Sequence, residues 1–197
     1  MQGDGAASRP LKEESVYLVS VSTYDEVRKI VDSRDLYWIS DCRCRLDRGG
    51  VCTKSMRVCL GFGPKCTSSE SHLAPADKKE VLELLELART ERLVPRPHVG
   101  DDGAIAAVCF CCACCCCYHQ SASDKARDKA GPGVSSLDRD ACLACGQCVE
   151  VCHFGALILE DGTPELKQAR CHGCGLCAEE CPSGAIRMEL RAGAPGR

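Results

Sequence analysis

The sequence predicts an α+β protein in two parts: a small α/β cysteine-rich region over residues 10-118 and a duplicated βαβ module over 134-191, joined by a linker over 119-133. Three observations lead to this fold class. The twenty cysteines stand in separate clumps, one segment repeats at a fixed offset, and short β-rich runs alternate with amphipathic helical runs. The chain of 197 residues can bury a core, but the clumped cysteines indicate small units that rely on metal ligation.

The N-terminal region begins with a strand, a helix and a second strand. Val16 to Val21 is rich in β-branched residues and predicts the first strand. Thr23 and Glu26 have the spacing of a capping box, and apolar residues at helical spacing follow them. Leu36 to Ile39 predicts the second strand. We therefore expect a β-α-β platform whose end delivers the chain to the first cysteines.

A metal-organised loop and a long helix are expected next. Cys42 to Ser71 is rich in Gly, Ser, Cys and basic residues and has no periodicity, which predicts a loop. Asp77 with Glu80 supplies a helix cap, and an apolar stripe follows. Pro95 and Pro97 are expected to end this helix.

The densest cysteine cluster follows a predicted strand. Ala104 to Val108 is an apolar, strand-like run, and the run from Cys109 to Cys117 contains seven cysteines. His119 to Gly133 is polar, charged and punctuated by Gly and Pro, so we interpret it as the linker.

After the linker, the segment that starts at Cys142 repeats at Cys171, an offset of 29 residues. Each copy reads C-x-x-C-x-x-C-x-x-x-C. Thiols three apart in a loop can wrap one face of a cubane, while the fourth thiol points toward the other cluster. The sequence therefore predicts two crossed ligand sets, Cys142, Cys145, Cys148 and Cys181 for one cluster and Cys171, Cys174, Cys177 and Cys152 for the other.

Cys142 to Ile186 resembles the bacterial-type ferredoxin family with two 4Fe-4S clusters, and all eight ligand positions match. The resemblance covers roughly a quarter of the chain and implies a ferredoxin-like fold with two cubane clusters that transfer electrons. Family members usually have Pro after the fourth cysteine; Pro182 follows this rule, whereas His153 replaces the other proline. Zinc is the alternative, because C-x-x-C pairs also bind zinc, but three evenly spaced cysteines plus a remote fourth favour clusters.

The N-terminal cysteines predict a further metal site. In an extended chain Cys42 and Cys44 face the same way, and the neighbouring arginines, Arg43 and Arg45, would offset thiolate charge. Our hypothesis is that one additional cluster is bound by Cys42, Cys44, Cys52 and Cys59. The sequence does not indicate what Cys66 and the Cys109 to Cys117 run bind.

Three interpretations of this region stay open: one or two further iron-sulfur clusters, structural zinc, or redox-switching thiols. The order C-x-C-R, two spaced cysteines, a helix and then C-x-C-C-x-C-C before a ferredoxin module resembles cysteine-rich 4Fe-4S proteins of anaerobic bacteria and archaea. That resemblance implies more clusters without naming a reaction.

Composition excludes several classes of function. A formal net charge of -3 provides no basic footprint for nucleic acid. No run is long enough to span a membrane, and Met1 to Arg9 lacks the apolar segment of a signal peptide. We therefore expect a cytoplasmic protein of an anaerobe, whose thiols bind metal in place of forming disulfides.

The leading functional prediction is a non-catalytic electron carrier or electron-transfer subunit that works with a redox partner protein. Val134 to Arg197 carries more acidic than basic residues, which favours a partner with a basic docking face. The alternative is a redox enzyme whose N-terminal cluster binds substrate and is fed by the ferredoxin module. An iron-sulfur or zinc sensor is a third hypothesis, but it would need an output module, and the sequence shows none.

Overall fold

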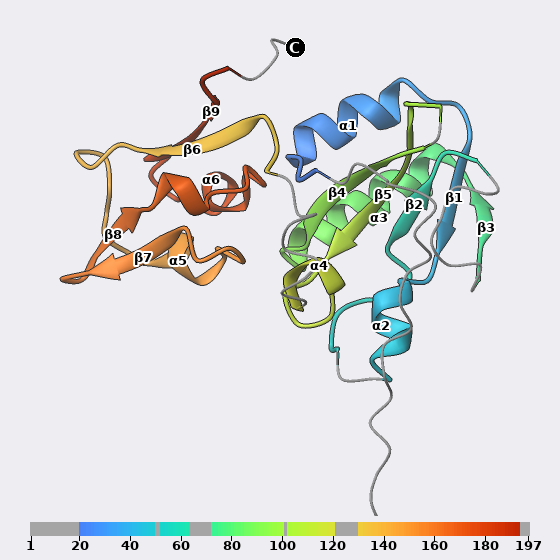
Figure 1. Ribbon diagram of the computed structural model, residues 1–197, viewed down its shortest axis with the longest axis horizontal. Coiled ribbons are helices and arrows are strands. Elements are labelled where there is room, and N and C mark those ends of the chain that lie inside the picture. Colours follow the sequence, from blue (N-terminus) through green and yellow to red (C-terminus); the bar gives the residue numbers. More distant parts are fainter. Residues whose placement is uncertain (1–19, 50–51, 64–71, 101, 121–129, 194–197) are drawn as a thin grey trace, which may run out of the picture.

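The computed structural model describes residues 20–49, 52–63, 72–100, 102–120 and 130–193. Figure 1 shows two lobes, a larger N-terminal one built on a sheet and a smaller C-terminal one. The predicted strand at Val16 to Val21 lies mostly outside the described residues, as does Cys66. None of the described helices combines the length and the apolar character that crossing a bilayer requires.

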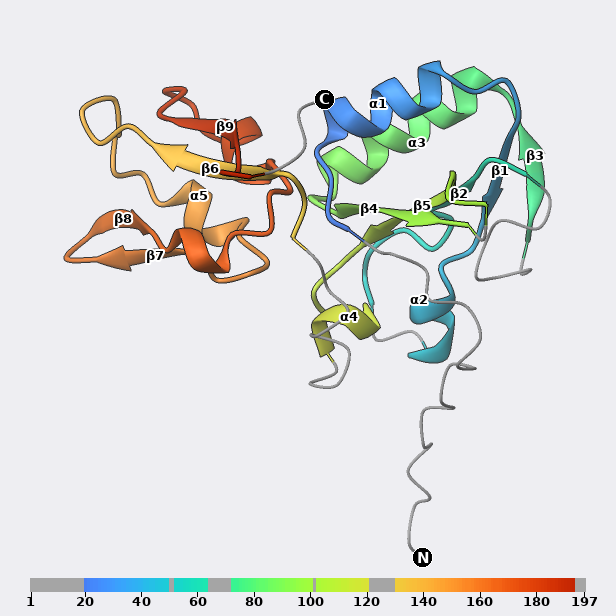
Figure 2. The ribbon, with the colours of Figure 1, turned by 45° about the horizontal axis from the view of Figure 1, so that its top comes forward.

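The N-terminal lobe contains a five-stranded antiparallel sheet with the strand order β3-β1-β2-β5-β4. Its strands are β1 (Tyr37–Ser40), β2 (Cys59–Gly61), β3 (Ala74–Ala76), β4 (Val94–Val99) and β5 (Ile105–Cys111). The two longer helices, α1 (Tyr24–Asp32) and α3 (Lys78–Thr90), lie on one side of this sheet in Figure 2, and the short helices α2 (Arg43–Asp47) and α4 (Cys117–Gln120) lie on the other.

Both predicted helices of this lobe are confirmed together with their caps. The backbone N–H of Glu26 donates to the Thr23 hydroxyl at 3.3 Å, and the Thr23 N–H donates to the Glu26 carboxylate at 2.7 Å. Asp77 and Glu80 form the same reciprocal pair at the start of α3. Each box satisfies N–H groups that the first helical turn leaves without a partner.

The prediction that Pro95 and Pro97 end the long helix is wrong. Helix α3 already ends at Thr90, and both prolines lie inside β4. Strand β4 is at the edge of the sheet, where a residue without an N–H removes no bond between two strands. On this outer edge the N–H of Ser22 donates to the Pro95 carbonyl at 3.1 Å.

The prediction of a loop without regular structure from Cys42 to Ser71 is also wrong in part, because this segment contains α2 and β2. Cys42 is the N-cap residue of α2, so Cys44 lies within a helix and not in an extended strand. The i, i+2 argument for these two thiols therefore does not apply, although their side chains do meet, as described below.

The C-terminal lobe contains two segments, each ordered strand, short helix, strand. The first consists of β6 (Gly133–Leu137), α5 (Gln147–Glu150) and β7 (Leu157–Glu160), and the second of β8 (Thr163–Leu166), α6 (Leu176–Glu179) and β9 (Ile186–Leu190). The strands pair between segments, β6 with β9 and β7 with β8, both antiparallel. Each segment therefore supplies one strand to each of the two two-stranded sheets, and neither segment can form a sheet alone.

The two lobes share one continuous apolar core, and polar contacts join them at its edge. The Arg89 guanidinium pairs with Glu179 at 3.4 Å, and the Arg92 guanidinium pairs with Glu180 at 3.0 Å. The His153 ring nitrogen Nε2 lies 2.7 Å from the Arg92 carbonyl oxygen. The C-terminal lobe is thus packed against the N-terminal one through the ends of both its segments.

Candidate metal centres

One hollow in the C-terminal lobe is lined by four cysteines that come from both segments. The empty space within it, open solvent included, is about 290 Å³. Three thiols belong to the first segment and one to the second, namely Cys142, Cys145, Cys148 and Cys181. Leu137 and Ile186, a cross-strand pair of β6 and β9, add apolar walls.

A second hollow of about 310 Å³ repeats this arrangement with the segments exchanged. Its four cysteines are three from the second segment and one from the first, namely Cys171, Cys174, Cys177 and Cys152. Val151, Leu157 and Leu166 line the rest of it. Thiols spread around an apolar hollow of this kind are what an iron-sulfur cubane requires of its protein, so the donor set and the space fit such a cluster.

Backbone conformation bends the two cysteine loops around these hollows. Gly146 and Gly175, which occupy equivalent positions in the repeat, cap α5 and α6 with φ of 77° and 81°. Gly173 has φ of 81°, while its counterpart Ala144 has φ of 53°. The difference between the last two is packing: a Cβ at Gly173 would lie 2.3 Å from the carbonyl oxygen of Gly133.

N–H and O–H groups point at the cysteine sulfurs. The N–H of Ser135 lies 3.5 Å from Cys171 Sγ, and the N–H of Ala156 lies 3.2 Å from Cys152 Sγ. The Ser135 hydroxyl lies 3.2 Å from Cys177 Sγ. Such donors favour thiolate over thiol and stabilise the negative charge of a bound cluster.

The two hollows differ in exposure and in what surrounds them. Cys145 is exposed in the first hollow, whereas Cys171, Cys174 and Cys177 are all buried in the second. Burial raises the pKa of Cys174 to about 12 and that of Cys177 to about 11, so metal binding there must displace thiol protons.

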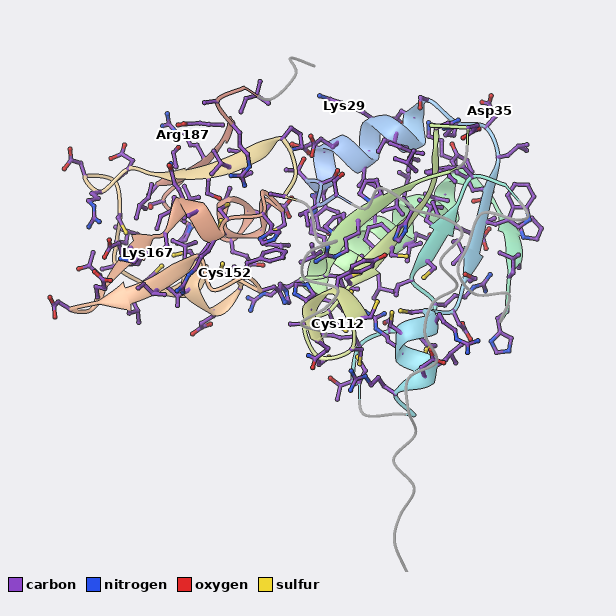
Figure 3. The ribbon with its side chains drawn as sticks, viewed as in Figure 1. Lys29, Asp35, Cys112, Cys152, Lys167 and Arg187 are labelled. Atoms are coloured by element: carbon purple, nitrogen blue, oxygen red, sulfur yellow. The ribbon has the colours of Figure 1, made fainter. Side chains whose placement is uncertain are left out.

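The loop of the buried hollow faces the N-terminal lobe. A Cβ at Gly175 would lie 3.1 Å from the Thr23 methyl group at the start of α1. The His172 ring stacks on Phe154 with a centroid distance of 4.1 Å, and Phe154 in turn lies 5.1 Å from the His119 ring of α4. Figure 3 shows Cys152 in this lobe and Cys112, a member of the next group, in the other.

The N-terminal lobe gathers its described thiols into two groups. In the first, the four sulfurs of Cys52, Cys112, Cys114 and Cys115 lie within 4.8 Å of one another. Cys52 Sγ is 3.6 Å from Cys112 Sγ and 3.5 Å from Cys114 Sγ. Residue 52 thus contacts a loop that directly follows β5, 60 residues away in the sequence.

The second group contains seven thiols, namely Cys42, Cys44, Cys59, Cys109, Cys111, Cys116 and Cys117. Cys42 contacts Cys44 and Cys59. Cys59 and Cys109 are cross-strand neighbours on β2 and β5, with their sulfurs 3.9 Å apart. We call this set the seven-thiol group.

The predicted set Cys42, Cys44, Cys52 and Cys59 is therefore divided between the two groups. Three of its thiols meet in the seven-thiol group, and Cys52 lies in the other. The two neighbouring arginines also differ: Arg45 is fully buried and its guanidinium contacts the Cys112 thiol, whereas Arg43 pairs with Asp47 on the surface at 2.9 Å.

Comparison with protein families identifies the C-terminal lobe. Residues 164–187 match a family model described as a 4Fe-4S binding domain, and residues 137–157 match a second model with the same description. Residues 137–187 hold a 4Fe-4S ferredoxin-type domain. A search of curated proteins found no match to the chain. The cysteines of both hollows lie in this domain. The match therefore indicates iron-sulfur binding and a role in electron transfer for this part of the chain.

Sequence reasoning missed the partners of Cys52. The C-x-C-C spacing of Cys112, Cys114 and Cys115 was the available signal, because three thiols within four residues of one turn can reach a common ion. It also missed Ser135, whose hydroxyl faces a cluster thiol from the neighbouring strand.

Proposed function

We propose that this protein is an electron carrier or electron-transfer subunit whose ferredoxin domain, a duplicated βαβ module, holds two 4Fe-4S clusters. One cluster is held by Cys142, Cys145, Cys148 and Cys181, and the other by Cys171, Cys174, Cys177 and Cys152. The supporting observation is the crossed lining of the two hollows, each with three thiols from one segment and one from the other. A carrier of this kind needs no substrate pocket of its own.

A bound cluster supplies one-electron chemistry, and the residues of the chain set the conditions for it. The thiolates hold the iron, and the apolar walls limit the access of water. Hydrogen bonds from Ser135 and Ala156 to cysteine sulfur stabilise the more negative, reduced state and so raise the reduction potential. The buried hollow carries the Ser135 hydroxyl in addition to amide donors.

The exposed hollow is the proposed point of contact with a redox partner protein. Cys145 is exposed, and the neighbouring Leu143 is 68% exposed, so a partner surface can approach the cluster edge directly. An apolar residue beside the ligands offers contact area without a charge to desolvate. The buried hollow is turned toward the N-terminal lobe and serves internal transfer.

The rest of the chain fits this proposal in outline. We propose an N-terminal cysteine-rich region over 10–118, a linker over 119–133 and the ferredoxin domain over 134–191, with further iron-sulfur clusters or zinc in the N-terminal region. We place the protein in the cytoplasm, with a protein and not a nucleic acid as its partner.

The test is iron and acid-labile sulfide analysis with electron paramagnetic resonance on anaerobically purified full chain. Cys145→Ala and Cys174→Ala should each lose about four iron and four sulfide, and the magnetic coupling between the two clusters should disappear. Leu143→Ala, which changes the same loop without removing a ligand, is the control and should retain both clusters. A full iron count in either cysteine variant would overturn the ligand sets.

A second candidate function is a redox enzyme whose N-terminal cluster reacts with substrate and is fed by the ferredoxin domain. The seven-thiol group favours it, because seven convergent thiols can hold a cluster in the lobe next to the buried hollow. Cyanide, a small ligand for an open iron position, is the probe. A spectral change that Cys44→Ser abolishes would support an enzyme, and an unchanged spectrum would support the carrier.

A further inference from the structure

The described thiols of this protein are arranged in two geometrically different ways. In the ferredoxin domain, each set of four cysteines lines a hollow. In the group of Cys52, Cys112, Cys114 and Cys115, the sulfurs touch one another, with separations of 3.5 and 3.6 Å and none beyond 4.8 Å. Cysteine thiols therefore surround a hollow in one part of the molecule and contact one another in another part.

These separations fit a single metal ion. Zinc binds thiolate at about 2.3 Å in a tetrahedron, which places the four sulfurs roughly 3.8 Å apart. A four-iron cluster attaches each thiolate to a different iron and lies between them, so its ligands must stand further apart. Within the described residues, the cysteines of the ferredoxin domain form no group of three or more whose sulfurs all lie within 4.8 Å of one another. Contacting sulfurs leave no room for a cubane.

The surroundings of the group compensate for its charge. Four thiolates around a divalent ion carry a net charge of about minus two. The Arg45 guanidinium, fully buried, contacts Cys112 and also donates to the carbonyl oxygens of Ser55 and Phe110, which fixes its position. The backbone N–H of Lys54 donates to the Cys52 sulfur. A buried arginine beside converging thiols is expected where those thiols are ionised.

We propose that Cys52, Cys112, Cys114 and Cys115 bind one thiophilic divalent ion, Zn²⁺ or Fe²⁺, in a closed tetrahedral site. All four positions are protein ligands, which is typical of structural sites, and binding releases the thiol protons. The ion joins the segment before β2 to the loop between β5 and α4. Because Cys111 and Cys116 flank that loop and belong to the seven-thiol group, the ion also positions these two thiols.

The experiment counts metals in the full chain, purified anaerobically from cells supplied with both zinc and iron. Cys114→Ser is the test variant because Cys114 is exposed and contributes little to packing. Cys117→Ser is the matched control, since it changes a thiol of the same run that belongs to the seven-thiol group. The visible absorption of the ferredoxin domain reports that each variant is folded.

The wild-type chain should contain one ion beyond its clusters, seen as zinc or as iron in excess of acid-labile sulfide, and X-ray absorption should show four sulfur ligands at about 2.3 Å. Cys114→Ser should lose this one ion, and Cys117→Ser should keep it. Loss of iron and sulfide in equal amounts from Cys114→Ser would overturn the proposal in favour of a cluster. A wild-type chain without the extra ion, or a Cys114→Ser variant that keeps it, would overturn it as well.

Discussion

The close approach of Gly173 to β6 allows a sharp test of how the buried hollow is built. Gly173 has φ of +81°, and a Cβ there would lie 2.3 Å from the Gly133 carbonyl oxygen and 2.9 Å from its carbon. Gly146 has φ of +77°, but a Cβ there would meet nothing within 4 Å. Gly173→Ala and Gly146→Ala therefore impose the same backbone strain, and only the first adds a collision.

The strain of a left-handed alanine is about 1–2 kcal/mol in both variants. The repeat itself shows that such an alanine is tolerated, because Ala144 occupies the position equivalent to Gly173 with φ of +53°. The collision is with backbone, so the start of β6 must shift, which typically costs a further 1–3 kcal/mol, roughly. We expect Gly173→Ala to be less stable than Gly146→Ala by about that second amount.

Cluster loading and thermal unfolding measure this difference. A chain of this size loses about 2–4 °C of melting temperature per kcal/mol, so the two variants should differ by several degrees. Since β6 also carries Ser135, whose N–H points at Cys171, Gly173→Ala should in addition lose iron and sulfide from the buried hollow. Equal melting temperatures with full iron in both variants would refute the packing argument.

Three further predictions concern pH, capping and exposure. Burial, together with the nearby Arg96 charge, lowers the pKa of His98 to about 4, so the unfolded chain binds more protons below pH 6.5. Stability should fall by up to about 2 kcal/mol from pH 7 to pH 5, and His98→Gln should remove this loss in denaturant titrations. Asp77→Ala removes the cap bond to the Glu80 N–H, so unfolding should require about 1 kcal/mol less, and an unchanged denaturation midpoint would contradict this. Because Cys145 is exposed and Cys174 is buried, a chelator should remove iron in two phases, and Cys145→Ser should lack the fast one; a single phase in the wild type would contradict this.

The local features of the fold could be predicted from the sequence because their causes are local. Both capping boxes depend on residues three positions apart, and the strand from Tyr37 to Ser40 on a short apolar run. The helix end was misplaced for a different reason. Pro95 and Pro97 suit an edge strand as well as a helix stop, and only the partner strand β5 decides between them.

The candidate sites show the same difference between features with local causes and features that depend on distant segments. In the ferredoxin domain a fixed spacing determines where each loop places its three thiols, so the grouping around each hollow matches the spacing pattern. In the N-terminal lobe the neighbours of Cys52 depend on the pairing of β2 with β5, which brings segments about 60 residues apart together. The spacing of the cysteines within residues 42–59 therefore cannot predict the neighbours of Cys52.

The spacing of the cysteines also explains why their thiols surround a hollow in the ferredoxin domain and contact one another in the N-terminal lobe. Cysteines three positions apart, with a glycine in the left-handed conformation, spread the sulfurs around a hollow, whereas C-x-C-C in a tight loop brings them into contact. The two hollows are in turn unequal, since one opens at Cys145 and the other faces α1. Under the proposed function, an electron that enters the ferredoxin domain from the N-terminal lobe would reach the buried hollow first and leave through the exposed one. In that proposal the thiols of the N-terminal lobe lie at the inner end of the path, and a reaction other than electron transfer would have to take place there.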